Sequence, residues 1–186
     1  QSLGKNQLIT IDGKVMAVAC MANAQHLVVR QDILDKVGKP VPSTYEEVLE
    51  TAEAIRSACI MKYPFAMLTK SDWNLGEEVV NMYLGHGGEF FKPGTAEASV
   101  NNAKGVATLE MLKSLMEYSN PDFLTYNTGA VVPLWESGEL AMAEIWGSSM
   151  GSLLDDEGST PEVVSNTVPA NAPTVGGGSN PASTLW

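Results

Sequence analysis

The stretch ELAMAEIWGSSMGSLL, residues 139–154, decides the fold. Up to Trp146 nearly every residue is apolar or small, and no polar residue alternates with them before Glu144. This pattern is typical of a central strand that is buried on both faces of an α/β sheet. The residues after Trp146 suit a turn and then a helix. The stretch therefore predicts a strand, a loop and a helix in succession, which is the repeating unit of an α/β fold.

The loop after this strand carries the motif of a hydrolase nucleophile. Residues 147–151 spell G-x-S-x-G around Ser149, and GHGG at residues 85–88 lies upstream, where some esterases place an oxyanion-hole loop. The triad of these enzymes needs a histidine after the serine, whereas both histidines of the chain, His26 and His86, precede it. A serine hydrolase fragment that uses Ser149 is therefore kept only as the alternative, and GHGG is more typical of a helix C-terminus.

The same loop is a candidate binding site, because ligands of open α/β sheets collect where strands end and helices begin. Glu144 offers an acceptor for hydroxyl groups and Trp146 offers an apolar face. Ser148 and the backbone N–H groups near Gly147 offer hydrogen-bond donors. The competing interpretation makes Trp146 a core residue and Glu144 a paired surface acid.

A second strand end repeats this chemistry. YPFAMLT, residues 63–69, predicts a buried strand, and SDW, residues 71–73, follows it. Asp72 and Trp73 place a carboxylate beside a flat apolar ring. Such a pair suits a sugar, because carboxylates recognise its hydroxyl groups and aromatic rings pack on its C–H faces. We therefore predict a carbohydrate site where these strands end.

Elsewhere the chain alternates strands with helices, which favours an α/β layer architecture. Asp12-Gly13 predicts a type I′ hairpin, Thr44 and Glu47 form a capping box at a helix start, and Gly38 ends another helix. We expect a hairpin over residues 8–18, a loop over 169–186, and strands over 26–30, 63–69, 139–146 and, more weakly, 162–168. Helices are expected over residues 31–37, 45–55, 74–86, 102–118 and 130–137. The helix over 102–118 is expected to bury Val106, Leu109, Leu112 and Met116.

Composition narrows the classes of partner. The 186 residues are 44% hydrophobic and 18% charged, which is typical of a globular domain, and the formal net charge is −11. This charge argues against nucleic acid and against anionic membrane surfaces as partners. VMAVACMANA, residues 15–24, is about half as long as the roughly 20 residues that a membrane span needs. No direct membrane insertion is expected.

The cysteines and histidines indicate no cofactor. Cys20 and Cys59 lack C-x-x-C spacing, and two histidines cannot complete a zinc site with neighbouring residues. We interpret both cysteines as small core residues, with a disulfide between them as the alternative. The chain is therefore expected to hold no metal and no cofactor.

Three segments together resemble one family, the extracellular solute-binding proteins of ABC importers, family 1, of the maltose-binding type. These segments are GKVMAVACMANAQHLVVRQDILDKVGKPVPSTYEEVLETAEAI (13–55), VNNAKGVATLEMLKSLME (100–117) and LWESGELAMAEIWGSSMGSL (134–153). GGGSNPASTLW (176–186) is similar to the Gly-rich return segment of this family. The order and spacing agree over residues 11–155.

The resemblance implies a fold and an organisation. It implies a periplasmic-binding-protein type II-like lobe, which is a three-layer α/β/α sandwich. Residues 1–186 would form one lobe of a two-lobed protein, mostly its second lobe, and the first lobe and the final helices would be absent from this chain.

The resemblance also implies a function that involves no catalysis. A small solute, expected to be a sugar, would bind between two lobes that close on it and would pass to the permease subunits of the importer. The protein would be periplasmic or extracellular and would meet the membrane through that transporter. The residues that match the cleft-facing positions of the family are Asn23, Asp72, Trp73, Glu144, Trp146, Gly147, Ser148 and Trp186. Arg30 and Gln31 depart from the pattern of the family at this strand.

Overall fold

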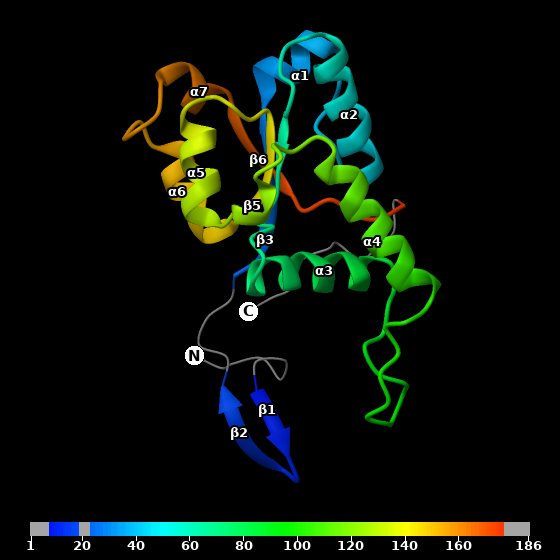
Figure 1. The fold of residues 1–186 in the computed structure, drawn as a ribbon. Coiled ribbons are helices and arrows are strands. Elements are labelled where there is room, and N and C mark those ends of the chain that lie inside the picture. Colours follow the sequence, from blue (N-terminus) through cyan, green and yellow to red (C-terminus); the bar gives the residue numbers. More distant parts are fainter. Residues whose placement is uncertain (1–7, 19–22, 177–186) are drawn as a thin grey trace.

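A computed structural model describes residues 8–18 and 23–176 of the chain. Its main body has three layers, with a four-stranded sheet between two groups of helices (Figure 1). The strands are β1 (Leu8–Ile11), β2 (Lys14–Val18), β3 (Gln25–Arg30), β4 (Phe65–Ala66), β5 (Met142–Trp146) and β6 (Thr167–Asn171). The α-helices are α1 (Gln31–Val37), α2 (Tyr45–Ser57), α3 (Trp73–Gly85), α4 (Ala103–Met116), α5 (Thr128–Glu136), α6 (Met150–Leu154) and α7 (Pro161–Asn166).

The direction of the strands brings several chain segments to one edge of the sheet. The strand order is β4-β5-β3-β6, with β4 parallel to β5 and β3 antiparallel to both β5 and β6. The C-terminal ends of β4, β5 and β6 therefore meet the start of β3 at the same edge. This edge carries the candidate functional residues.

Each face of the sheet has its own hydrophobic core, because successive side chains of a strand point to opposite faces. Leu27 and Val29 of β3 pack with Tyr45 of α2, whereas Val28 packs with Trp135 of α5. In Figure 1, α1, α2 and α4 cover one face and α5, α6 and α7 cover the other. The predicted three-layer α/β/α class is confirmed, and β5 is the buried inner strand that the sequence predicts.

Local signals fix several helix boundaries. Thr44 accepts a hydrogen bond from the Glu47 backbone at 3.1 Å while the Glu47 side chain accepts from the Thr44 backbone, so the capping box is confirmed. Gly38 ends α1 in the left-handed conformation with φ 66°. The Asn102 side chain accepts from two backbone N–H groups at the start of α4.

The predicted hairpin is also confirmed. β1 and β2 pair antiparallel through Asp12 and Gly13, whose φ angles are 49° and 75°. Two positive φ angles in a two-residue loop are the mark of a type I′ turn. The hairpin forms a sheet of its own, apart from the four-stranded sheet (Figure 1).

The prediction for the last part of the chain is partly wrong. The segment 162–168, expected as a strand, is mostly helix α7, because Thr160 caps its first turn and Pro161 takes the first helical position. The strand in this region, β6, begins at Thr167, so only the last two residues of the expected strand are in it, and it continues to Asn171 into the expected loop over 169–186. Residues 177–186 of that loop lie outside the described residues.

Two expectations about burial are wrong as well. Val106 and Leu109 of α4 are more than half exposed, whereas Leu112 is buried as expected and Met116 is partly buried against the core. The helix also buries Thr108 and Leu115, which were not expected. Cys59 is exposed, because it follows the C-terminal end of α2 in a left-handed conformation with φ 55°. Cys20 lies outside the described residues.

Candidate functional site

Two of the predicted site residues, Asn23 and Ser148, form hydrogen bonds with each other at the edge of the sheet. Asn23, just before β3, donates from its side-chain amide to the Ser148 hydroxyl at 3.1 Å. The Ser148 backbone N–H donates back to the Asn23 side-chain oxygen at 3.2 Å. Residues 125 positions apart in the chain thus form one polar group at the sheet edge. The side chain of Ser148 is exposed and is free to bond a hydroxyl group of a solute.

Gly147 lies between this polar group and a histidine. Its backbone N–H donates to the Ala24 carbonyl at 2.8 Å. A Cβ atom at Gly147 would lie 2.9 Å from Cδ2 and 3.0 Å from Nε2 of His26. The glycine therefore lets the imidazole of His26 pack directly against the backbone at the end of β5.

Asp72 and Trp73 stand at the start of α3, as the sequence predicts. The Asp72 carboxylate accepts from the backbone and the side chain of Asn74 at 2.9 and 2.7 Å, and pairs with Lys70 at 3.1 Å. Hydrogen bonds from the Asn74 side chain and backbone hold the pKa of Asp72 below its ordinary value, so the carboxylate is charged at neutral pH. The Trp73 side chain is 63% exposed.

Trp146 and Glu144 are too buried to offer a ligand much contact surface. Trp146 is only 7% exposed and packs in the core that faces α5 and α6, so little of its ring can reach a solute. Glu144 is fully buried, and the Tyr45 hydroxyl donates to its two oxygens at 3.0 and 2.9 Å. The expected hydroxyl-accepting role of Glu144 does not agree with this burial, and the carboxylate instead joins β5 to α2.

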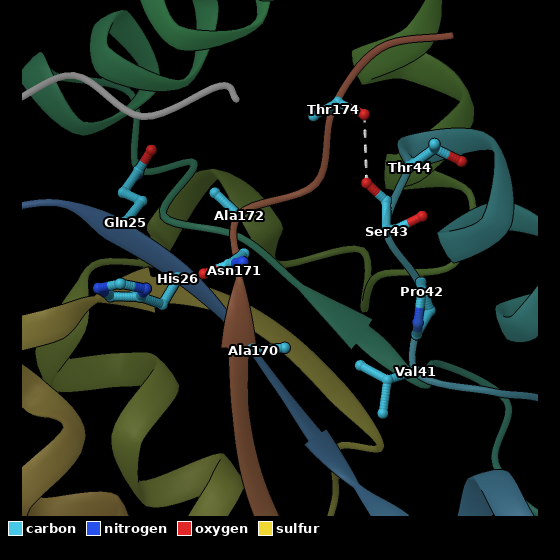
Figure 2. Close-up of a pocket in the computed structure, with 10 residues that line it drawn as sticks. All are labelled: Gln25, His26, Val41, Pro42, Ser43, Thr44, Ala170, Asn171, Ala172 and Thr174. Atoms are coloured by element: carbon cyan, nitrogen blue, oxygen red, sulfur yellow. Dashed lines mark hydrogen bonds between the residues drawn. The ribbon is translucent and has the colours of Figure 1, made fainter. Parts of the chain in front are cut away.

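A cavity of about 690 Å³ borders the same edge. Figure 2 shows it between the end of β6 and the segment that leads into α2. Thr174 closes one side, where its backbone N–H and hydroxyl donate to the Ser43 carbonyl at 2.9 and 3.3 Å. Apolar groups and a few hydroxyl and amide groups share the walls, and the volume lies within the range of small-molecule sites. The lining residues are Gln25, His26, Val41, Pro42, Ser43, Thr44, Ala170, Asn171, Ala172 and Thr174.

Three residues of this region were not predicted from the sequence, namely His26, Asn171 and Thr174. His26 and Asn171 face each other in the pairing of β3 with β6. The segment 169–186 was expected to be a loop, so no strand pairing pointed to Asn171. The Asn-Ala-Pro sequence that begins with the last residue of β6, polar and turn-forming at a strand end, is the signal that could have marked it.

Arg30, which departs from the pattern of the family, lies at the other end of β3. Its guanidinium donates to both oxygens of Asp32 at 2.8 and 2.9 Å and is almost fully buried. Gln31, the second departure, begins α1 and donates from its side chain to Asp35 at 2.7 Å. Both side chains therefore serve the far end of the sheet, away from the candidate site.

Ser149 is not placed as a nucleophile. Its backbone, with φ −92° and ψ −6°, is ordinary helical geometry, whereas a nucleophile elbow is a strained turn. No hydrogen bond joins Ser149 to His26 or His86 among residues 8–18 and 23–176. GHGG ends α3 with Gly87 in the left-handed conformation, φ 70°, as the helix-end interpretation predicts.

Metal-binding and membrane-spanning features are not found in the described residues. In the part of the chain that the structure describes, no group of three or more His, Cys, Asp or Glu side chains is arranged to hold a metal ion. None of the described helices is both long and apolar enough to cross a membrane. Trp186, the last predicted site residue, lies outside the described residues.

Solved structures share this fold. Maltose-bound MalE3 of T. maritima has a TM-score of 0.80 at 22% identity over 97% of this chain and 47% of that one. An ABC transporter solute-binding protein of Agrobacterium vitis with bound D-mannitol has a TM-score of 0.80 at 20% identity over 97% and 45%. One from Agrobacterium radiobacter in complex with ribitol has 0.77 at 23% identity over 91% and 42%. The chain thus spans somewhat less than half the length of each protein.

These likenesses show the fold, a lobe of the periplasmic-binding-protein type II class, as the sequence predicts. Comparison with curated proteins gives no match. The sequence itself matches the family described as bacterial extracellular solute-binding protein over residues 4–186, which is nearly its whole length. The chain therefore belongs to the family of bacterial extracellular solute-binding proteins.

Proposed function

We propose that this chain is part of the substrate-binding component of an ABC importer, and that it binds a carbohydrate or a related polyhydroxylated solute at the sheet edge. The solute contacts are Trp73, Asp72, Asn23, Ser148 and the backbone at Gly147. Trp146 contributes only the small part of its ring that remains exposed. The bound maltose, D-mannitol and ribitol of the similar structures support this class of solute.

The observation that carries the proposal is the exposed indole of Trp73 beside a charged carboxylate. An indole that is 63% exposed at the edge where strands end offers a flat apolar face that a solute can cover. A sugar presents C–H faces for the ring and hydroxyl groups for the Asp72 oxygens. The Asn23–Ser148 pair adds a donor and an acceptor at the same edge.

In this proposal residues 1–186 form one lobe, and the solute is held between it and a second lobe. The hairpin of β1 and β2 supports the proposal of a second lobe, because its apolar side chains are exposed and it belongs to no larger sheet among the described residues. A second lobe would cover these side chains. Closure of the lobes around the solute would then present a changed surface to a membrane permease. The place of action would be the periplasm or the cell exterior.

A titration of the two-lobed protein that contains this chain tests the proposal. Binding of maltose, D-mannitol and ribitol would be measured by calorimetry, first with the natural sequence and then with Trp73→Ala. We expect one of these solutes to bind, and Trp73→Ala to weaken it by about 2 kcal/mol, roughly thirtyfold in Kd, because a central tryptophan contact carries about this much.

Phe91→Ala is the matched control. Phe91 is also an exposed aromatic residue, but it pairs with Ala98 in the segment between α3 and α4 and does not lie at the sheet edge. Its removal should leave the affinity unchanged. If Phe91→Ala and Trp73→Ala weakened binding equally, or if none of the polyhydroxylated solutes bound, the proposed site would be wrong.

A further inference from the structure

A buried polar cluster fixes α3 on the sheet directly behind the candidate site. Glu78 of α3 is fully buried, and its Oε1 accepts from the side-chain amide of Gln25 at 2.8 Å and from the Leu68 backbone N–H at 3.1 Å. The Gln25 oxygen in turn accepts from the Asn81 side chain, one turn further along α3. The first residue of β3 is thus the polar anchor of the helix that begins with Trp73.

The same cluster touches the other strands of the site. Gln25 pairs with Trp146 in the register of β3 and β5, and it lies two residues after Asn23. The second oxygen of Glu78, Oε2, is buried and accepts no hydrogen bond. A movement of Glu78 would therefore shift α3 against the strands that carry the other solute contacts.

Glu144 is the second carboxylate in this interior. It too is fully buried, and its hydrogen-bond partner is the Tyr45 hydroxyl of α2. Glu77 on α3 is the other acid that acts on Glu78. Among the described residues no ion pair joins Glu78 or Glu144 to a lysine or an arginine. Two carboxylates thus lie fully buried with no cation paired to either of them among the described residues.

Protonation of one of the two carboxyl groups removes one of these buried negative charges. Burial and the neighbouring Glu144 raise the pKa of Glu78 well above its ordinary value, and burial raises the pKa of Glu144 to about 8. The two groups interact, so the proton belongs to the pair and is not assigned to one oxygen. At neutral pH the pair keeps at least one proton.

We propose that Glu78 is a positioning residue of the solute site: the proton that it shares with Glu144 keeps α3 docked on the sheet, and loss of this proton at alkaline pH releases α3 and moves Trp73 out of place. The inference rests on the proposed function for its effect on binding. Its effect on α3 is independent of any solute.

The sign of the pH dependence follows from linkage. In the unfolded chain these carboxyls release their protons near the ordinary value of 4.5, whereas the folded protein keeps the shared proton to a higher pH. The folded state therefore binds more protons between these limits, and the free energy of unfolding falls as pH rises through this window. Above the folded pKa the two buried charges repel each other fully.

The first measurement uses the protein without solute. Hydrogen exchange would give the protection of the α3 amides, corrected for intrinsic rates, at about pH 6 and about pH 9. We expect α3 to lose about tenfold or more of its protection at the higher pH, because the free energy of unfolding falls by about one decade in the unfolding constant for each pH unit over which only the folded protein holds the proton. Glu78→Gln keeps an oxygen for Gln25 and Leu68 and should abolish this loss. The control Glu110→Gln removes an exposed acid of α4 and should not.

Glu144→Gln serves as a second variant in case Glu78→Gln does not fold. It removes the other carboxylate of the pair, on β5, and keeps an acceptor for the Tyr45 hydroxyl, so it should give the same resistance to alkaline pH. If α3 is equally protected at both pH values, or if both glutamine variants lose protection as the natural protein does, the inference is wrong.

The second measurement repeats the calorimetric titration with maltose and D-mannitol at the same pH values. We expect affinity to fall about tenfold at the higher pH in the natural protein and to hold in Glu78→Gln. If no solute binds at either pH, the proposed function is wrong. The anchoring of α3 is then still tested by hydrogen exchange, which needs no solute. Solute binding that falls equally in both proteins would overturn the positioning role alone.

Discussion

Gly147 decides how closely β3 and β5 approach at the candidate site. A Cβ atom there would lie 2.9 Å from the His26 ring and 3.3 Å from the Ala24 carbonyl oxygen. Gly147→Ala would therefore force the imidazole or the backbone to move. We expect it to lower the free energy of unfolding by about 1–3 kcal/mol, the usual cost of overpacking, in a urea titration.

The cause of this cost can be separated from a general effect of alanine. With His26→Ala in the same protein, the ring that meets the new methyl group is gone, and Gly147→Ala should cost much less. A double-mutant cycle measures this coupling. Additive effects of the two substitutions would show that contact with His26 is not the reason for the glycine.

For single residues, the sequence predicted the place in the fold better than the burial and the hydrogen bonds of the side chain. Asp72 and Trp73 were expected at a strand end, and they begin α3 at the sheet edge. Asn23 and Ser148 were expected near the ligand, but their mutual hydrogen bonds were not. The burial of Glu144 was missed, because its partner Tyr45 is 99 positions away and only the folded chain brings the two together.

Two helical glycines with different surroundings test the packing of α3 and α4. A methyl group at Gly76 in α3 would have no neighbouring atom within 4 Å, whereas one at Gly105 in α4 would lie 2.2 Å from the Val100 carbonyl oxygen. Alanine favours a helix over glycine by about 1 kcal/mol. Gly76→Ala should therefore stabilise the protein by about 0.5–1 kcal/mol, and Gly105→Ala should destabilise it by about 1–3 kcal/mol.

Thermal unfolding of both variants beside the natural protein checks this pair. The two substitutions are chemically identical and both lie inside helices, so helix propensity cancels between them. Opposite shifts in melting temperature are expected. Equal shifts of one sign would mean that the segment before α4 does not hold Val100 against Gly105.

Elements with local boundary signals could be predicted, and those that depend on contacts could not. The capping box of α2 and the left-handed glycine after α1 act within a few residues, so the sequence contains their whole cause. The buried face of α4 was predicted correctly at Leu112 but wrongly at Val106, because Val106 fits a helical stripe as well as Leu115 does. Which stripe is buried depends on where α3 and the sheet lie.

For the whole molecule, the alternation of strands and helices predicted an α/β layer architecture, and the resemblance to the solute-binding family implied its three layers. The sequence could not predict that β3 runs antiparallel to its neighbours β5 and β6 within this sheet. Periodicity carries no information about strand direction. This direction nevertheless sets the site, since it brings the start of β3 and the end of β6 to the edge where β5 ends.

The hairpin of β1 and β2 gives a test of the proposed second lobe. Ile9, Ile11, Val15, Met16 and Val18 are between 50% and 63% exposed. A two-stranded hairpin is marginally stable alone, and its free edges and apolar side chains favour association. We expect residues 1–186, purified on their own, to self-associate as concentration rises in size exclusion with light scattering, because the hairpin would then lack the cover of the proposed second lobe.

Substitution in the hairpin should reduce this association without unfolding the main body. Ile9→Thr with Met16→Thr keeps a β-branched residue or introduces one, so the strands can still form while apolar surface is removed. Leu154→Ser removes an exposed leucine from α6 and is the control. If the hairpin variant associates as strongly as the natural chain, another surface is responsible, and the exposed hairpin no longer supports a second lobe.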